Sequence, residues 1–127
     1  MDKIIRLEAA IAFDSETFCA VFSGNDSDDS YSYILTYEGN LEQPWSRADV
    51  PRKIDGLTGK LDGEGRPVIY AVSEEGDVYT IWPGKASQHM KIIGAGVYSE
   101  DATGLGYINS ATLVDDMILV AGYHSQL

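Results

Sequence analysis

The sequence is poor in the residues that most binding and catalytic chemistry requires. It holds one cysteine, two histidines and nine lysine and arginine residues among 127, against 20 aspartate and glutamate residues, so its formal charge is −11. Phosphate binding needs clustered lysine and arginine, and this charge therefore argues against a nucleic-acid or anionic-membrane surface. No run approaches the roughly 18 apolar residues that a membrane helix needs. A partner selected by charge would be basic.

Two features of the sequence indicate the cellular compartment: the single cysteine and the first residues of the chain. Cys19 stands in an apolar run with no basic neighbour, which predicts a buried structural thiol rather than a nucleophile. A single cysteine also excludes an intramolecular disulfide. The first residues alternate charged and apolar side chains and leave no hydrophobic signal-peptide segment. We therefore expect a cytoplasmic protein.

Helical periodicity is scarce as well, and strand-like runs take its place. Short runs rich in Val, Ile, Tyr and Phe alternate with turn residues, which predicts an all-β protein. The expected strands include residues 18–22, 31–37, 68–72, 78–82, 107–114 and 117–121. Only two segments, 9–13 and 85–92, have a helix-like pattern, and both are short.

A unit of strand, turn and strand recurs along the chain. The apolar residues that end each second strand, Val21, Val72 and Ala121, stand 51 and 49 positions apart, which gives approximate repeats at 1–50, 51–100 and 101–127. In the first two repeats a third strand follows, and then a further segment at 45–50 or 89–93. Four short antiparallel strands in a repeat of this length are typical of a β-propeller blade. An ordinary meander with similar hairpins is the alternative.

This pattern resembles bacterial β-propellers of the WD40-like or BNR-like kind. In particular, residues 106–122 resemble blades of propeller proteins that act as immunity partners of bacterial toxins. The chain lacks the Gly-His and Trp-Asp pairs of true WD40 repeats and the Gly-Gly pair of kelch repeats. The resemblance implies a non-enzymatic immunity protein that neutralises a toxin by covering its active site.

The length conflicts with a closed propeller. Four to eight blades at this period need on the order of 200 to 400 residues, whereas 127 residues supply about two and a half blades. We therefore expect antiparallel four-stranded blades of an incomplete β-propeller, as a single domain over residues 1–127. Its open edges need a cover, which could be the remaining part of the propeller, copies of the same chain or a different protein. The break within the third repeat favours the first of these.

Signals for catalysis, metals and cofactors are weak. His89 and His124 have no metal-ligand spacing to each other or to the cysteine. The acidic run at 24–30 lacks the glycine and the final acidic residue of an EF-hand loop. No serine stands in a Gly-x-Ser-x-Gly motif. We therefore predict no catalytic residues, no metal site and no cofactor.

Acidic residues recur at equivalent turns of the repeats. Between first and second strands the sequence has Asp14 and Glu16, Asp62 and Glu64, and Asp115 and Asp116. Between second and third strands it has Asp26, Asp28 and Asp29, and then Glu74, Glu75 and Asp77. Equivalent turns share one face of a propeller, so we expect carboxylates on each face that steer a basic protein partner.

The second set of turns, with the end of the chain, gives the predicted partner-binding residues. These are Asp26, Asp28, Asp29, Glu74, Glu75, Asp77, Tyr123 and His124. Trp45, Trp82 and Tyr123 are candidate aromatic anchors, but for Trp45 and Trp82 we expect packing between blades instead. A second functional hypothesis is a carbohydrate-binding, lectin-like module that closes by homo-oligomerisation and binds its ligand between blades through Trp and Tyr.

Overall fold

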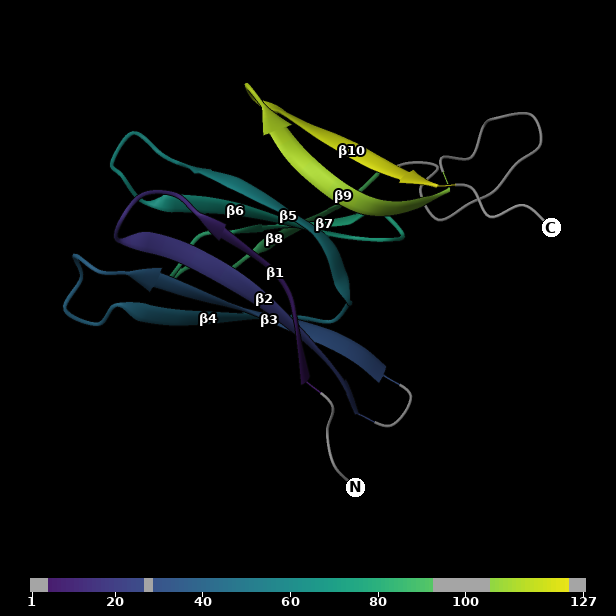
Figure 1. The fold of residues 1–127 in the computed structure, drawn as a ribbon, viewed down its shortest axis with the longest axis horizontal. Helices are drawn as coiled ribbons and strands as arrows, with labels where there is room; N and C mark the ends of the chain where they lie inside the picture. Colours follow the sequence, from purple (N-terminus) through teal and green to yellow (C-terminus); the bar gives the residue numbers. More distant parts are fainter. Residues whose placement is uncertain (1–4, 27–28, 93–105, 124–127) are drawn as a thin grey trace.

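The computed structural model describes residues 5–26, 29–92 and 106–123, and within these ranges every regular element is a β-strand. The strands form three antiparallel sheets, stacked as successive layers (Figure 1). In each sheet the strands neighbour one another in chain order. The structure confirms the predicted all-β class and the antiparallel four-stranded sheets, and the layers do not close into a barrel.

The bounds of the strands follow the three repeats. Sheet 1 consists of β1 (Ile5–Ala12), β2 (Thr17–Asp26), β3 (Asp29–Glu38) and β4 (Trp45–Val50). Sheet 2 consists of β5 (Ile54–Leu61), β6 (Pro67–Ser73), β7 (Asp77–Ile81) and β8 (Gln88–Lys91). Sheet 3 consists of β9 (Tyr107–Val114) and β10 (Met117–Tyr123).

The two short segments with a helix-like pattern, 9–13 and 85–92, contain strands rather than helices. Residues 9–12 belong to β1, and residues 88–91 form β8. A short apolar run such as 9–13 satisfies a helical or an extended pattern equally well, and partners elsewhere in the chain decide between them. Here β2 pairs with β1 at every residue except one, and β7 pairs with all of β8.

Each first strand carries a β-bulge at the same point of the repeat. The three aligned residues, Val21, Val72 and Ala121, pair with Ala9, Gly56 and Ser110. The residue just before each of these partners is skipped by the ladder. The skipped residues are Glu8, Asp55 and Asn109. Because a bulge bends a strand and increases its twist, the repeat has a common backbone shape even where side chains differ.

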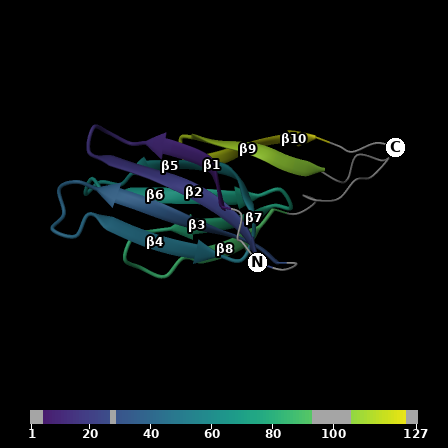
Figure 2. The same cartoon turned by 60° about the horizontal axis from the view of Figure 1, so that its bottom comes forward.

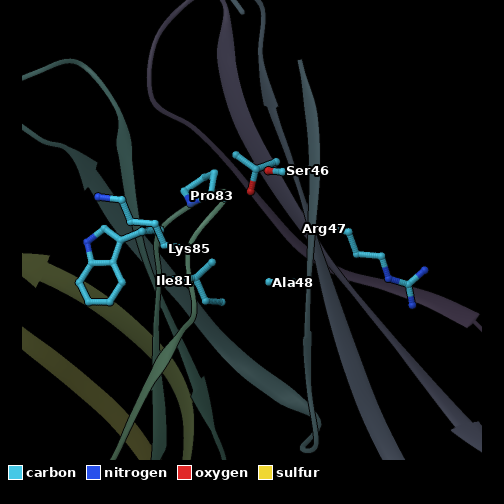
Figure 3. A pocket seen from close by; sticks show the side chains of 9 residues that line it. Ser46, Arg47, Ala48, Ile81, Pro83 and Lys85 are labelled. Carbon is cyan, nitrogen blue, oxygen red and sulfur yellow. The ribbon is translucent and has the colours of Figure 1, made fainter. Parts of the chain in front are cut away.

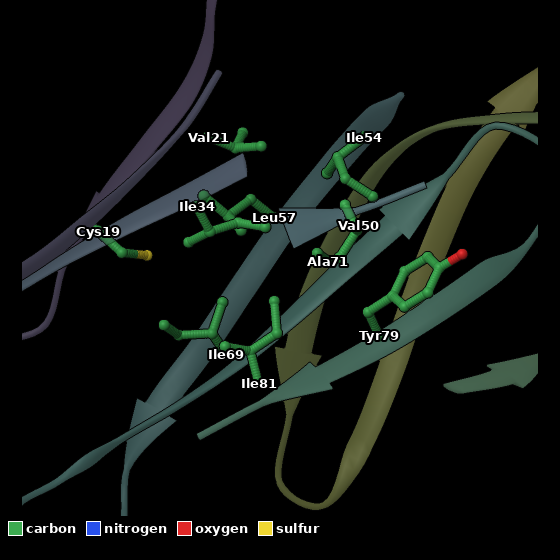
Figure 4. Close-up of a cluster of buried hydrophobic side chains, with 10 residues drawn as sticks. All are labelled: Cys19, Val21, Ile34, Val50, Ile54, Leu57, Ile69, Ala71, Tyr79 and Ile81. Atoms are coloured by element: carbon green, nitrogen blue, oxygen red, sulfur yellow. The ribbon is translucent and has the colours of Figure 1, made fainter. Parts of the chain in front are cut away.

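The main core lies between sheets 1 and 2. Alternate residues of β2 and β3 point toward sheet 2 and are buried, as the strand period of two requires. The cluster consists of Cys19, Val21, Ile34, Val50, Ile54, Leu57, Ile69, Ala71, Tyr79 and Ile81 (Figure 4). A smaller cluster of Val72, Val78 and Ile108 joins sheet 2 to sheet 3.

A glycine permits the close approach of sheets 2 and 3. A Cβ atom on Gly56 of β5 would lie 3.0 Å from both the Cβ and the backbone nitrogen of Ala111 in β9. Any larger residue at position 56 would push β9 outward. The packing of the third sheet therefore depends on this one missing side chain.

Candidate functional site

The turns that follow β1, β5 and β9 lie on the same side of the sheet stack (Figure 1). All six of their acidic side chains are exposed. We call this surface the first-turn rim, and it consists of Asp14, Glu16, Asp62, Glu64, Asp115 and Asp116. The antiparallel repeat thus places Asp14 and Asp116, which are 102 positions apart in the chain, on one side of the protein.

Two of these carboxylates help to form their own turns. Oδ1 of Asp14 accepts a hydrogen bond from the backbone N–H of Glu16 at 2.8 Å. Oδ1 of Asp62 accepts from the backbone N–H groups of Glu64 at 2.8 Å and Arg66 at 2.9 Å. The bonds from Arg66 and Glu64 hold the pKa of Asp62 below its usual value. Turn chemistry therefore accounts for Asp14 and Asp62.

The glutamates of the same turns have no such role. The structure gives the carboxylates of Glu16 and Glu64 no hydrogen bond or ion pair with any described residue, and both side chains are exposed. They remain available to a partner. Asp116, 94% exposed, accepts one bond from Lys60 at 3.1 Å.

The cations near this rim do not cancel its charge. Lys60 is paired with Asp116, and Arg66 is paired with Glu38 of sheet 1. Lys85 lies close enough to lower the pKa of Asp62 slightly further. Against these three cations stand the six rim carboxylates and Glu38, so the rim is negative.

On the opposite side of the stack, the β6–β7 turn places the predicted residues in two different environments. Glu74 and Glu75 are exposed, as a binding role requires. Asp77 is buried, with its side chain 7% exposed. Only the two glutamates of this predicted group therefore present carboxylates to a partner.

Asp77 is held by its own sheet. Oδ2 accepts a hydrogen bond from the Ser73 hydroxyl at 3.0 Å, and Oδ1 lies 2.9 Å from His89 Nε2. Arg52 Nε lies 3.5 Å from Oδ2 and Lys91 Nζ lies 3.9 Å from it. Burial opposes ionisation of Asp77, but the bonds from His89 and Ser73 and the nearby cations outweigh it and hold the pKa below its usual value.

Sequence reasoning missed this network. The separation of Ser73 and Asp77 by four residues around Gly76 is a local signal, because Ser73 Oγ also accepts from the Asp77 backbone N–H at 3.0 Å. His89 joins only through the pairing of β7 with β8, where it stands opposite Tyr79. That pairing brings residues 12 positions apart into contact.

The surface around the β6–β7 turn, which we call the second rim, carries charges of both signs. Arg52, Lys53 and Lys91 surround Asp77 and Asp55, and Lys53 Nζ lies 3.5 Å from Asp55 Oδ1. Cations of the chain itself therefore accompany the carboxylates on this side. Of the two rims, the first-turn rim is the more strongly acidic among the residues that the structure describes.

The other predicted binding residues lie at the edge of the described chain or beyond it. Asp26 ends β2 and Asp29 begins β3, where the two pair with each other, and Tyr123 ends β10. The side chains of these three residues lie outside the described part, as do Asp28 and His124 entirely. Their proposed binding role stays a prediction.

A pocket lies between sheets 1 and 2, where the carbohydrate hypothesis expects a ligand. It is lined by Ser46, Ala48 and Arg47 of β4 and by residues around the β7–β8 turn, among them Trp82 and Lys85. Its volume is about 20 Å³, which is room for a water molecule or two. The Arg47 side chain points away from Pro83 and Ile81, to the other side of β4 (Figure 3). The pocket is too small to accept a sugar ring.

Among the residues that are placed, no group of three or more His, Cys, Asp and Glu side chains is arranged to hold a metal ion. That same part of the chain contains no helix with the length and apolarity needed to cross a membrane.

Comparison of the chain with protein-family models, with curated proteins and with solved structures finds no match.

Proposed function

We propose that this protein is a non-enzymatic protein-binding module that presents the first-turn rim to a basic protein. The observation that carries the proposal is that six exposed carboxylates stand in three equivalent turns on the same side of the sheet stack. A surface of one sign raises the rate of encounter with an oppositely charged protein and selects against acidic ones.

The resemblance to immunity proteins gives this binding a biological form. A basic toxin would be held across the rim, and the sheets behind it would keep its active site covered. Glu16 and Glu64 are the contact residues on which we place most weight, because turn formation does not occupy their carboxylates. Asp115 and Asp116 extend the same rim onto sheet 3.

A pair of matched double variants tests the proposal. Glu16→Gln with Glu64→Gln removes two charges from the first-turn rim, and Glu74→Gln with Glu75→Gln removes two from the opposite rim. Cytochrome c serves as a basic protein probe, with association rates measured by stopped-flow or surface plasmon resonance at low and high salt. We expect the first pair to slow association several-fold more than the second, with the difference vanishing as salt rises.

The two variants have the same net charge, so only the position of the lost charge differs. Equal association rates for both would overturn the rim as the binding surface. A rate for the wild-type chain that does not change with salt would overturn the electrostatic basis of the proposal. Circular dichroism of each variant confirms that the exposed substitutions leave the fold intact.

A further inference from the structure

The middle sheet shows how the sheets of this fold cover one another. We call the side of a sheet that faces the preceding sheet its front face, and the opposite side its back face. On the front face of sheet 2, Ile54 and Ile69 are fully buried against sheet 1. On its back face, Val68 is 8% exposed and Val72 is fully buried, the latter against sheet 3.

In the two outer sheets, sheet 1 and sheet 3, the side chains at the equivalent positions are exposed. Leu7 takes the place of Ile54 on the front face of sheet 1, since they pair with the equivalent residues Phe22 and Ser73, and it is 61% exposed. Phe18, which takes the place of Ile69, is 39% exposed. Figure 2 looks onto this front face.

The back face of sheet 3 is open in the same way. Met117 takes the place of the nearly buried Val68 and is 66% exposed. Leu119 on the same face is 60% exposed, and Val114 opposite Met117 is 45% exposed. The outer faces of sheets 1 and 3 therefore expose apolar side chains at positions whose equivalents in sheet 2 are buried.

The front face of sheet 1 is an ordered aromatic surface. Phe18 stacks on Tyr37 with ring centroids 5.2 Å apart, and Trp45 packs edge-on against Tyr37 at 4.9 Å. Trp45 is 56% exposed, so it does not pack between the two sheets as an internal anchor. A second row sets Phe22 on Tyr33 at 5.2 Å.

The front face of sheet 1 and the back face of sheet 3, which we call the two end faces, carry no net charge in their described parts, although the formal charge of the chain is −11. On the front face of sheet 1, Arg47 is paired with Asp49 at 2.8 Å and lies over the Tyr33 ring, so the described part of this face has no net charge. The back face of sheet 3 is formed by Ser110, Thr112, Val114, Met117, Leu119 and Ala121. Few charges together with aromatic residues, Met and Arg mark the centre of a protein interface rather than ordinary surface.

We propose that these two faces bind each other between copies of this chain. Within the chain, the front face of one sheet is covered by the back face of the sheet before it, as sheet 1 covers sheet 2. The back face of sheet 3 in one copy offers the front face of sheet 1 in a second copy the same kind of cover. Such a contact is head to tail, so it repeats from copy to copy and closes into a ring where the rotation allows.

This assembly is separate from the proposed binding of a basic protein. The two faces lie on the layers at the ends of the stack, whereas the first-turn rim runs along the turns at one side (Figure 1). The rim therefore stays accessible in the assembled form. Either proposal can fail without the other.

Two single substitutions and their mixture test the head-to-tail contact. Leu119→Glu places a charge on the back face of sheet 3, and Leu7→Glu places one on the front face of sheet 1; both positions are more than half exposed. Light scattering and native mass spectrometry over a range of concentrations measure the molecular mass. We expect the wild-type chain to form dimers or larger rings and each variant alone to be monomeric.

The mixture distinguishes the geometry of the contact. Leu119→Glu keeps an intact front face and Leu7→Glu keeps an intact back face, so the mixture should form a one-to-one heterodimer and nothing larger. A Leu119→Glu variant that still dimerises would show front faces pairing with each other and overturn the head-to-tail contact. A wild-type chain that stays monomeric at the highest concentration reached would overturn self-association altogether.

A third variant controls for the loss of exposed apolar surface. Met90 on β8 is 60% exposed and lies on neither end face. Met90→Glu should leave the mass of the assembly unchanged. Circular dichroism checks that each variant is folded, and Trp45→Glu and Met117→Glu replace either face variant that is not.

Discussion

Glu38 of sheet 1 and Arg66 of sheet 2 form an ion pair across the interface between the first two sheets. Arg66 Nη2 donates to Glu38 Oε2 at 3.0 Å, and Nε donates to Oε1. The glutamate side chain is 4% exposed and the arginine 41% exposed. The guanidinium therefore supplies both oxygens of a nearly buried carboxylate with donors.

Removing Arg66 should destabilise the protein more than removing a comparable surface cation. Arg66→Met leaves the buried Glu38 carboxylate without these donors, at a cost of about 1–3 kcal/mol once solvent screening of the half-exposed arginine is allowed for. Lys60→Met breaks the exposed pair with Asp116 and should reduce the stability far less, because solvent screens exposed pairs. Urea denaturation at pH 7 measures both. Equal losses would mean that Arg66 contributes no more than a surface charge.

Asp77 should make stability sensitive to acid. Its folded-state pKa lies below the unfolded value of about 3.9, so the ionised form favours the folded state. This contribution is fully present above pH 4 and is lost as the pH falls through the lower folded-state pKa. Asp77→Asn should therefore be less stable than wild type at pH 7, with a smaller difference at pH 3.

The pH experiment has a neighbouring control. Glu75→Gln removes an exposed carboxylate two positions away and should leave the unfolding free energy nearly unchanged at both pH values. Urea midpoints at pH 7 and pH 3 give the comparison. If Asp77→Asn loses the same free energy at both pH values, its effect comes from packing rather than from charge.

Gly56 should be intolerant of a side chain. The Cβ of Gly56→Ala would lie 3.0 Å from the Ala111 side chain and backbone, and such overpacking costs about 1–3 kcal/mol. Gly63→Ala is the matched change in an open turn, where a Cβ meets nothing within 4 Å. We expect loss of stability in the first variant, with faster hydrogen exchange in β9 and β10. Unchanged exchange there would show that sheet 3 does not depend on this approach.

Cys19 should be unreactive while the protein is folded. Burial raises the pKa of its thiol to about 12, against a small opposing effect of a hydrogen bond from the Ile11 backbone, so little thiolate exists at pH 8. A thiol reagent such as dithionitrobenzoate should label the native protein only on the timescale of unfolding. In urea it should label one thiol per chain at once. Rapid labelling of the native state would place Cys19 outside the core.

Strand alternation, the turn glycines and the repeat could be predicted from the sequence, because they depend on local chemistry. The alternation of buried and partly exposed residues in β2 and β3 follows from the strand period, and Gly65 and Gly76 adopt the positive φ values that their turns require. The alignment of Val21, Val72 and Ala121 matches the register, because each pairs next to an equivalent bulge. These features depend on neighbours close in the chain.

Contacts between distant residues decided the rest. Residues 9–12 became strand because β2 pairs with them, although their local pattern also fits a helix. The sequence placed Asp77 in the same turn as the exposed Glu74 and Glu75. In the structure it is buried instead, because β8 brings His89 and Lys91 into contact with its carboxylate. Turn chemistry predicted acidic residues on both rims, but only the stacking of the sheets showed which rim carries cations as well. The sequence by itself determined the strands, the turns and the repeat, because these follow from local conformational preference. Only the tertiary structure decided which charges are exposed. Exposure depends on which residues from elsewhere in the chain pack against each side chain.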